Sequence, residues 1–205
     1  MKAQPTNTFD SKFEIIKWYD DFEIDKIDYP PNILNDTPKI SAPEALELKK
    51  HNLVDVRSSW EFKYDHIPGA SHFPILENHE RHKVGTIYKA LGRNAAIKAA
   101  LFFARPKQIE LLKLIKGLDH TKPIAVYCWR GGGRSKYVYQ LLKNQKVDCI
   151  RIDGGYKKYR NFVFNYLTNK VPESYKFIRI CGLTGSGKTR ILTELKNQFP
   201  NQIEV

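Results

Sequence analysis

The chain has 205 residues, of which 41% are hydrophobic and 27% are charged, and its formal net charge is +12 at pH 7. It is long enough to bury one ordinary core and to add a second small unit. It has no apolar run near the roughly 18 residues of a membrane-spanning helix, no apolar segment at its start that would indicate a secretory signal, and three cysteines spaced too widely for a disulfide framework or a zinc site. The sequence therefore predicts a cytoplasmic protein that does not contact a membrane.

Residues 1–37 are predicted to form an N-terminal extension, which ends in a linker rich in Pro, Asn and Asp (DYPPNILNDTP). Four basic and seven acidic side chains give residues 1–28 a net charge of −3, so the remaining 177 residues carry +15. A basic body of this size predicts a polyanionic partner, most commonly a nucleic acid. The alternative is a solvated surface with no such partner.

From Pro38 onward, short apolar segments alternate with amphipathic ones. The expected strands are residues 38–41, 52–56, 70–75, 123–128 and 148–152. The expected helices are residues 43–51, a helix that opens at 58–62, residues 106–117, a helix that starts at Ser135, and residues 156–170. Strands that alternate with helices predict an α/β fold with a parallel sheet and helices on both faces.

Local patterns add detail to these helices. Ser58 and Glu61 have the spacing of a capping box. Helical spacing selects the residues that should face the core, namely Ile109, Leu112, Ile115, Val138, Leu141, Leu142, and most of Tyr156, Tyr159, Val163 and Tyr166. The domain prediction is an extension at 1–37, a domain at 38–172 and the start of a second domain at 173–205.

The stretch YCWRGGGRS, residues 127–135, follows the most apolar of the predicted strands. Cys128 should lie at the carboxyl edge of the sheet, where ligands bind in open α/β folds. Three glycines allow a tight turn whose N–H groups face one point, and the helix that Ser135 begins directs its positive end there. We expect this loop to lower the pKa of Cys128 and make it a nucleophilic thiolate. The expected anion-binding residues are Trp129, Arg130, Gly131, Gly132, Gly133, Arg134 and Ser135.

The alternative for this stretch is a buried cysteine followed by a flexible turn. The guanidinium of Arg134, whose planar fork suits phosphate-like oxyanions, favours the anion site.

Residues 182–189, GLTGSGKT, fit the phosphate-binding P-loop, with a strand expected before them and a helix after them. Lys188 would neutralise terminal phosphates and Thr189 would reach a Mg²⁺ ion, so a nucleotide or Mg²⁺ is a possible ligand. The expected phosphate-binding residues are Gly182, Gly185, Ser186, Gly187, Lys188 and Thr189. Cys181 is expected to be a buried strand residue, and a chance Gly-rich turn is the alternative for the motif.

The chain stops after QIEV, one further strand-like segment. We therefore expect the P-loop domain to be incomplete, either as a fragment or as half of a split protein, and to need a missing segment or a separate chain to cover its apolar surface.

Other candidates are weaker. Asp55 and Arg57 share the sheet edge of Cys128 and could support the site, although a structural ion pair, with Glu61 as a partner of Arg57, is favoured. His66 is more plausible as a turn residue than as a general acid. Residues 77–83 contain two histidines but no third convergent ligand, so no metal site is predicted.

Three stretches together resemble a known family. LVDVRSSWEFKYDHIPGASHFPI (53–75) is similar to the N-terminal signature of rhodanese-type sulfurtransferases, and YCWRGGGRS and IDGGYKKYR stand where their active-site loop and last strand and helix belong. The segment ERHKVGTIYKALGRNAA (80–96) and the fusion to a P-loop resemble the tRNA 2-selenouridine synthases. The arginine stands six residues after the cysteine, as in related phosphatases, rather than five, as in common rhodaneses; this favours a phosphate-sized group at Cys128.

The resemblance implies a transferase that replaces sulfur with selenium on a wobble-position 2-thiouridine of tRNA. Its co-substrates would be selenophosphate and geranyl diphosphate, with a geranylated tRNA as intermediate. Cys128 would carry the chalcogen or attack at the selenium centre. Two alternatives stay open: a cysteine-dependent phosphatase or simple sulfurtransferase, and a non-catalytic P-loop binding module.

Overall fold

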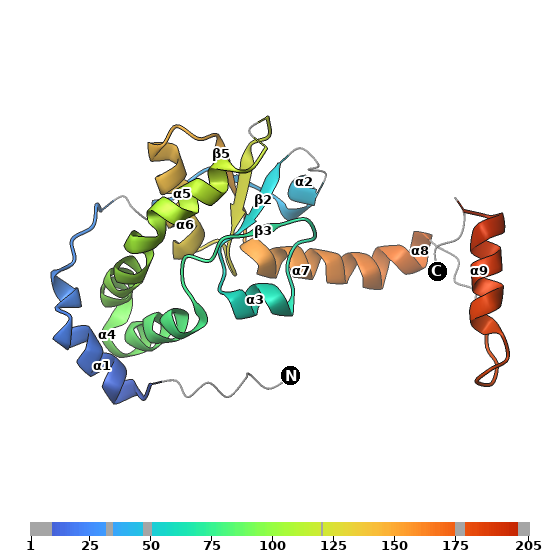
Figure 1. The fold of residues 1–205 in the computed structure, drawn as a ribbon, viewed down its shortest axis with the longest axis horizontal. Helices are drawn as coiled ribbons and strands as arrows, with labels where there is room; N and C mark the ends of the chain where they lie inside the picture. The colour runs from blue at the N-terminus through green and yellow to red at the C-terminus, as the bar shows by residue number, and fades with distance from the viewer. Residues whose placement is uncertain (1–9, 32–34, 47–50, 120, 175–178, 201–205) are drawn as a thin grey trace. The chain divides into compact units, whose positions relative to one another are not determined.

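A computed structural model describes residues 10–31, 35–46, 51–119, 121–174 and 179–200 (Figure 1). The chain divides into two compact units, Met1–Val163 and Phe164–Val205. Among the described residues, no helix is both long and apolar enough to cross a bilayer.

The first unit is built on a five-stranded sheet in the order β1-β5-β4-β2-β3, and every neighbouring pair is parallel. The strands are β1 (Lys39–Ile40), β2 (Asn52–Asp55), β3 (Ser71–His72), β4 (Ile124–Tyr127) and β5 (Cys149–Ile152). All four residues of the central strand β4 are buried, as its continuous apolar run predicts. The predicted parallel sheet is confirmed, with edge strands shorter than expected.

Helices cover both faces of the sheet. The helices of this unit are α1 (Lys12–Asp21), α2 (Ala42–Leu46), α3 (Ser59–Tyr64), α4 (Asn78–Ala104), α5 (Gln108–Lys116), α6 (Gly133–Asn144) and α7 (Gly155–Asn165), with 3-10 turns at Ile24–Lys26 and Arg105–Lys107. Alternate residues of β4 enter opposite cores. Val126 packs in a cluster with side chains of α4, α5 and α6, whereas Tyr127 packs with side chains of α2 and α7. Figure 1 shows α5 and α6 on one side of the sheet and α7 on the other.

Two helix details differ from expectation. Ile109 of α5 is 69% exposed, while Leu111 and Ile115 are buried. Residues 111 and 115 are one turn apart, and residue 109 lies two positions before the first of them, so it projects to the opposite side. The second difference is that α6 begins at Gly133, two residues before Ser135. The expected core positions Val138 and Leu142 are fully buried.

The N-terminal segment packs against α4, the helix that contains residues 80–96. Ile15, Tyr19 and Ile24 are buried in one cluster with residues of α4, and the ring of Trp18 stacks on Phe103 at 5.1 Å between centroids. Helix α4 contains a break at Gly92, where φ is 86° and ψ is −173°. Only glycine adopts this conformation easily, and the break turns the two halves of α4 in different directions. No packing partner was predicted from the sequence for residues 10–28, and the structure shows that they pack on α4.

The second unit contains a π-helical turn (Tyr166–Lys170), α8 (Val171–Ser174) and α9 (Lys188–Gln198). The helix expected after the P-loop is present as α9. Residues 179–183 have no regular secondary structure and residues 184–187 form a turn, so no strand is present there, and Cys181 is exposed. The prediction of a buried strand cysteine is therefore wrong. A strand needs a neighbour for its hydrogen bonds, and no other strand occurs among the described residues of this unit. The rest of the predicted strand, residues 175–178, lies outside the described residues.

Tyr166 is also more exposed than expected, at 44%. Tyr156 is buried, and Tyr159 and Val163 are half-buried, so the prediction holds for the residues nearest the sheet.

Candidate functional site

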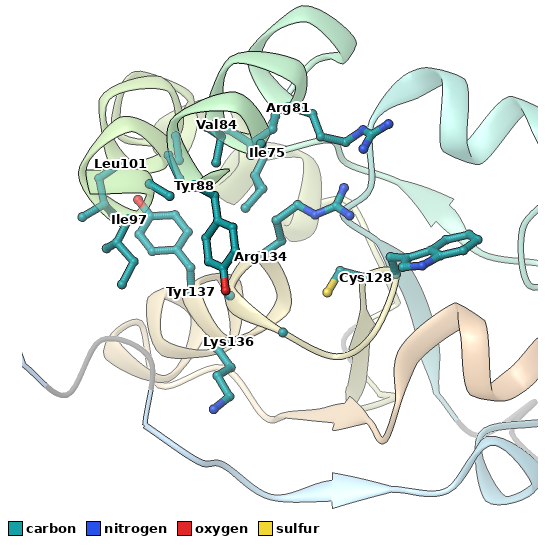
Figure 2. Close-up of a pocket in the computed structure, with 18 of the residues that line it drawn as sticks. Ile75, Arg81, Val84, Tyr88, Ile97, Leu101, Cys128, Arg134, Lys136 and Tyr137 are labelled. Carbon is teal, nitrogen blue, oxygen red and sulfur yellow. The ribbon is translucent and has the colours of Figure 1, made fainter. Parts of the chain in front are cut away.

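Cys128 directly follows β4 at the carboxyl edge of the sheet. It is only 3% exposed, yet it lines a cavity of about 600 Å³. Figure 2 shows Cys128 and Arg134 at one end of this cavity and Ile97 and Leu101 at the other. The thiol is therefore shielded from bulk water and open to a bound molecule.

The loop after Cys128 is held by its carbonyl groups. The backbone N–H groups of Tyr156 and Lys157 donate to the carbonyl oxygens of Cys128 and Trp129, each at 2.9 Å. A trans peptide directs its C=O and N–H to opposite sides, so the N–H groups of Trp129 and Arg130 point away from α7. These residues line the cavity. The start of α7 thus fixes the direction of these two loop amides.

This packing depends on Gly155. A Cβ atom at this position would lie 2.1 Å from the carbonyl oxygen of Cys128, and Gly155 has a φ of +57°. Any side chain here would push the loop away from α7 and break both hydrogen bonds. The second glycine of IDGGYKKYR is therefore part of the site, although it does not line the cavity.

Ser135 contacts the thiol directly. The Sγ–H of Cys128 donates to Oγ of Ser135 at 3.3 Å, and that hydroxyl donates to the carbonyl oxygen of Gly132 at 3.2 Å. Ser135 is fully buried in the first turn of α6. The same hydroxyl can turn and donate to an anionic sulfur.

Arg134 is oriented by Glu61. Its guanidinium donates to both carboxylate oxygens of Glu61, at 2.6 and 3.1 Å, and Arg81 lies 3.6 Å from the same carboxylate. Burial alone would raise the pKa of Glu61, but the hydrogen bond and charge of Arg134, the charge of Arg81 and the Ser58 N–H together lower that pKa to about 2. The buried carboxylate is therefore ionised at neutral pH and fixes the plane of the Arg134 fork.

Asp55 and Arg57 form a buried ion pair of their own, with 2.6 Å between Nη2 and Oδ2. The expected pairing of Arg57 with Glu61 is wrong, because Glu61 is taken by Arg134 and Arg81. The guanidinium of Arg57 also lies 4.0 Å from the ring centre of Tyr156. Neither residue lines the cavity, so their role is structural support under the loop.

Arg151, on β5, is a second buried cation near the thiol. Its Nη1 donates to the carbonyl oxygen of Gly131 at 2.7 Å, its Nη2 lies 3.2 Å from the carboxylate of Asp36, and its Nε donates to Thr37. Arg151 therefore links the segment before the first strand to the glycine loop. Arg151 was not identified as a site residue from the sequence, because it lies within an otherwise ordinary strand segment.

His66 bonds through Nδ1 to the carbonyl oxygen of Phe62, and its ring stacks on Phe62. It does not line the cavity, which fits the structural role. Among the residues that the structure describes, no three Asp, Glu, His or Cys side chains converge as a metal site would require.

The P-loop motif forms a turn closed by its own lysine. Nζ of Lys188 donates to the carbonyl oxygens of Gly182 and Leu183, at 2.8 and 2.7 Å, and Gly185 and Gly187 have φ angles of +84° and +83°. The phosphate-binding role of this loop, with Ser186 and Thr189, stays a prediction.

The rhodanese class of fold is defined by this parallel sheet with a cysteine at the end of its central strand, followed by a glycine turn and the start of a helix. The profile of the rhodanese-like domain family matches residues 41–162. The chain therefore belongs to the rhodanese-like domain family.

Within that family, the chain is similar to tRNA 2-selenouridine synthases. It is 37% identical to the tRNA 2-selenouridine synthase of Nitrosomonas eutropha over 80% of this chain and 43% of that protein. It is 36% identical to the one of Pseudomonas fluorescens over 85% of this chain and 44% of that protein. The resemblance to this group of proteins is thus confirmed, and the chain spans less than half the length of the curated relatives it matches.

One solved structure is similar in both sequence and fold. It is the N-terminal domain of a protein from Clostridium difficile 630 named for ATP/GTP binding. It is 38% identical, with a TM-score of 0.56, and the match covers 61% of this chain and 98% of that domain.

Proposed function

We propose that this chain acts in tRNA modification, as the part of a selenium transferase that carries the reactive cysteine. The supporting observation is Cys128, buried at the end of β4 and open to a cavity that Arg134 also lines. The relatives are named tRNA 2-selenouridine synthases, which supports a reaction that modifies tRNA. The reaction we propose is the exchange of sulfur for selenium on a wobble-position 2-thiouridine. Selenophosphate is the proposed selenium donor.

The cavity suits a larger molecule than selenophosphate alone. One part of its wall is formed by apolar side chains of Ile75 and α4, including Val84, Ile97 and Leu101. We propose that the geranyl group of an S-geranylated tRNA lies against this wall while the anion occupies the loop. Geranyl diphosphate itself, a nucleotide or Mg²⁺ is the proposed ligand of the P-loop.

The transfer can be tested without the geranylation step. The chain is incubated with selenophosphate and a tRNA whose 2-thiouridine is already S-geranylated, and the digested nucleosides are analysed by mass spectrometry. We expect 2-selenouridine from the geranylated tRNA and little from the unmodified 2-thiouridine tRNA. Faster turnover of para-nitrophenyl phosphate, or of thiosulfate with cyanide, and no selenium in the tRNA would favour the phosphatase or the sulfurtransferase instead.

Binding of tRNA should weaken steeply as salt rises. The net charge of +12 indicates binding through phosphates, and a protein that contacts about six phosphates loses about 10³-fold in affinity between 50 and 200 mM salt. Filter binding over a salt series, with and without selenophosphate, measures this slope. A single-stranded DNA of equal length controls for general polyanion binding, and a flat response to salt would count against tRNA as the partner.

A further inference from the structure

The described residues that line the cavity do not include the carboxyl or imidazole group that commonly protonates the leaving group in phosphatases. Five cations line it, Arg81, Arg93, Arg130, Arg134 and Lys136, and among the described lining residues there is no Asp, Glu or His. The cations suit a tetrahedral group with two negative charges. A carboxyl or imidazole group is the common proton donor to an alkoxide that departs from phosphorus, and the proton donors that do line the cavity are the weaker acids Tyr88, Tyr137 and Lys136. The site therefore suits a phosphoryl donor whose leaving group is stable as an anion.

A phosphorus–selenium bond provides such a leaving group. Selenide and selenolate hold negative charge far better than an alkoxide does, so they depart without a proton. The distance in sequence from Cys128 to Arg134, six residues, also gives a loop large enough for a phosphoryl group. A loop of phosphoryl size and a leaving group that departs as an anion are both what attack at phosphorus requires.

We propose that Cys128 attacks the phosphorus atom of a P–Se bond and becomes transiently phosphorylated. This inference rests on the proposed function for its selenium donor. In the first step the Sγ–P bond forms, the P–Se bond breaks, and its electron pair leaves on selenium. In the second step water attacks phosphorus, the S–P bond breaks with its electron pair returning to Sγ, and phosphate and a proton are released. Neither phosphorus nor selenium changes oxidation state.

Attack at selenium would form a different bond and distribute the electrons differently. It would form an S–Se bond, leave the electron pair of the P–Se bond on phosphorus and release phosphite, so that phosphorus is reduced by two electrons and the chalcogen pair is oxidised. The two routes therefore give different products, phosphate or phosphite, and different adducts on Cys128.

Ser135 is placed to assist the second step. Its hydroxyl lies 3.3 Å from Sγ in a fully buried position, where it can donate to the thiolate as that sulfur leaves phosphorus. Loss of one such donor to a developing anion lowers a rate by about 10²-fold. Ser135→Ala is therefore expected to slow dephosphorylation more than phosphorylation, and the phosphorylated protein should accumulate.

The test uses selenophosphate labelled in its phosphorus, with the chain alone and with S-geranylated tRNA. Rapid quenching and mass spectrometry of the peptide that carries Cys128 measure the adduct, and phosphorus NMR identifies the product. We expect a phosphorylated Cys128 in both variants, at a level about tenfold or more higher in Ser135→Ala, with phosphate as the product. Ser59→Ala, which removes a serine hydroxyl of α3 that donates to Glu77 at 3.1 Å, serves as the matched control and should behave as the original chain.

The two arms distinguish the source of the P–Se bond. An adduct formed without tRNA identifies free selenophosphate, and an adduct that requires tRNA identifies a selenophosphorylated uridine. Selenium bound to Cys128 with phosphite as product would overturn the inference. Selenium transfer to tRNA with no phosphorylated cysteine in either variant would also overturn the inference, but it would leave the proposed function standing. If neither selenium transfer nor a phosphorylated cysteine is found, both the inference and the proposed function are wrong. If Ser135→Ala does not fold, the quenched adduct of the original chain decides alone.

Discussion

Replacement of Cys128 by serine is expected to lower selenium transfer by about 10³-fold or more, as loss of a nucleophile does in other enzymes. Serine keeps the size of the side chain and the hydrogen bond to Ser135, so the loop should retain its shape. The hydroxyl is a far weaker nucleophile than the thiolate. The measurement is the rate of 2-selenouridine formation on S-geranylated tRNA, together with a thermal melt to show that folding is unchanged.

The other two cysteines provide controls. Burial raises the pKa of Cys149 to about 11, so this thiol stays protonated near neutral pH, and Cys181 is exposed. We expect Cys149→Ala and Cys181→Ser to retain transfer. Inorganic phosphate should slow alkylation of Cys128 by iodoacetamide and leave alkylation of Cys181 unchanged. Equal labelling of both with and without phosphate would argue against an anion site at Cys128.

Local sequence signals were sufficient for the parts of the molecule that local chemistry controls. The apolar run of β4 predicts a buried central strand, and the residues after Cys128 predict a glycine turn that leads into a helix, because turn and helix-start preferences act over a few residues. Anion binding by this loop stays a prediction. The capping box of Ser58 and Glu61 is present for the same reason.

Contacts between distant segments were not predictable. Glu61 and Arg134 are 73 positions apart, so the sequence identified the carboxylate as a helix cap and missed its bond to the active loop. The contacts of Arg151 and the packing of α1 on α4 were missed for the same reason, because they too join segments that are far apart in the sequence. Residues 179–181, the described part of the strand expected before the P-loop, show the converse: an apolar segment forms a strand only where a neighbouring strand accepts its hydrogen bonds.

Glu61→Gln is expected to destabilise the protein by about 3 kcal/mol at pH 7, because it leaves the buried guanidinium of Arg134 without its countercharge. The size also follows from the pKa of Glu61, which the neighbouring cations lower from 4.5 to about 2. The amide oxygen of glutamine can still accept from the N–H of Ser58, which bonds Glu61 at 3.1 Å. The substitution therefore removes the charge and keeps the helix cap.

The pH dependence separates this charge from other effects. A carboxylate with a lowered folded-state pKa stabilises the protein fully above its unfolded pKa of 4.5, and this contribution is lost as the pH falls through about 2. Urea unfolding at pH 7, 5 and 3 should thus show a gap between the original chain and Glu61→Gln that narrows only below pH 4.5. Arg81→Gln, which removes the partly exposed partner at 3.6 Å, should cost less than about 1 kcal/mol. A gap that is constant from pH 7 to 3 would mean that glutamine fails for reasons of packing, and the orientation of Arg134 would then need another cause.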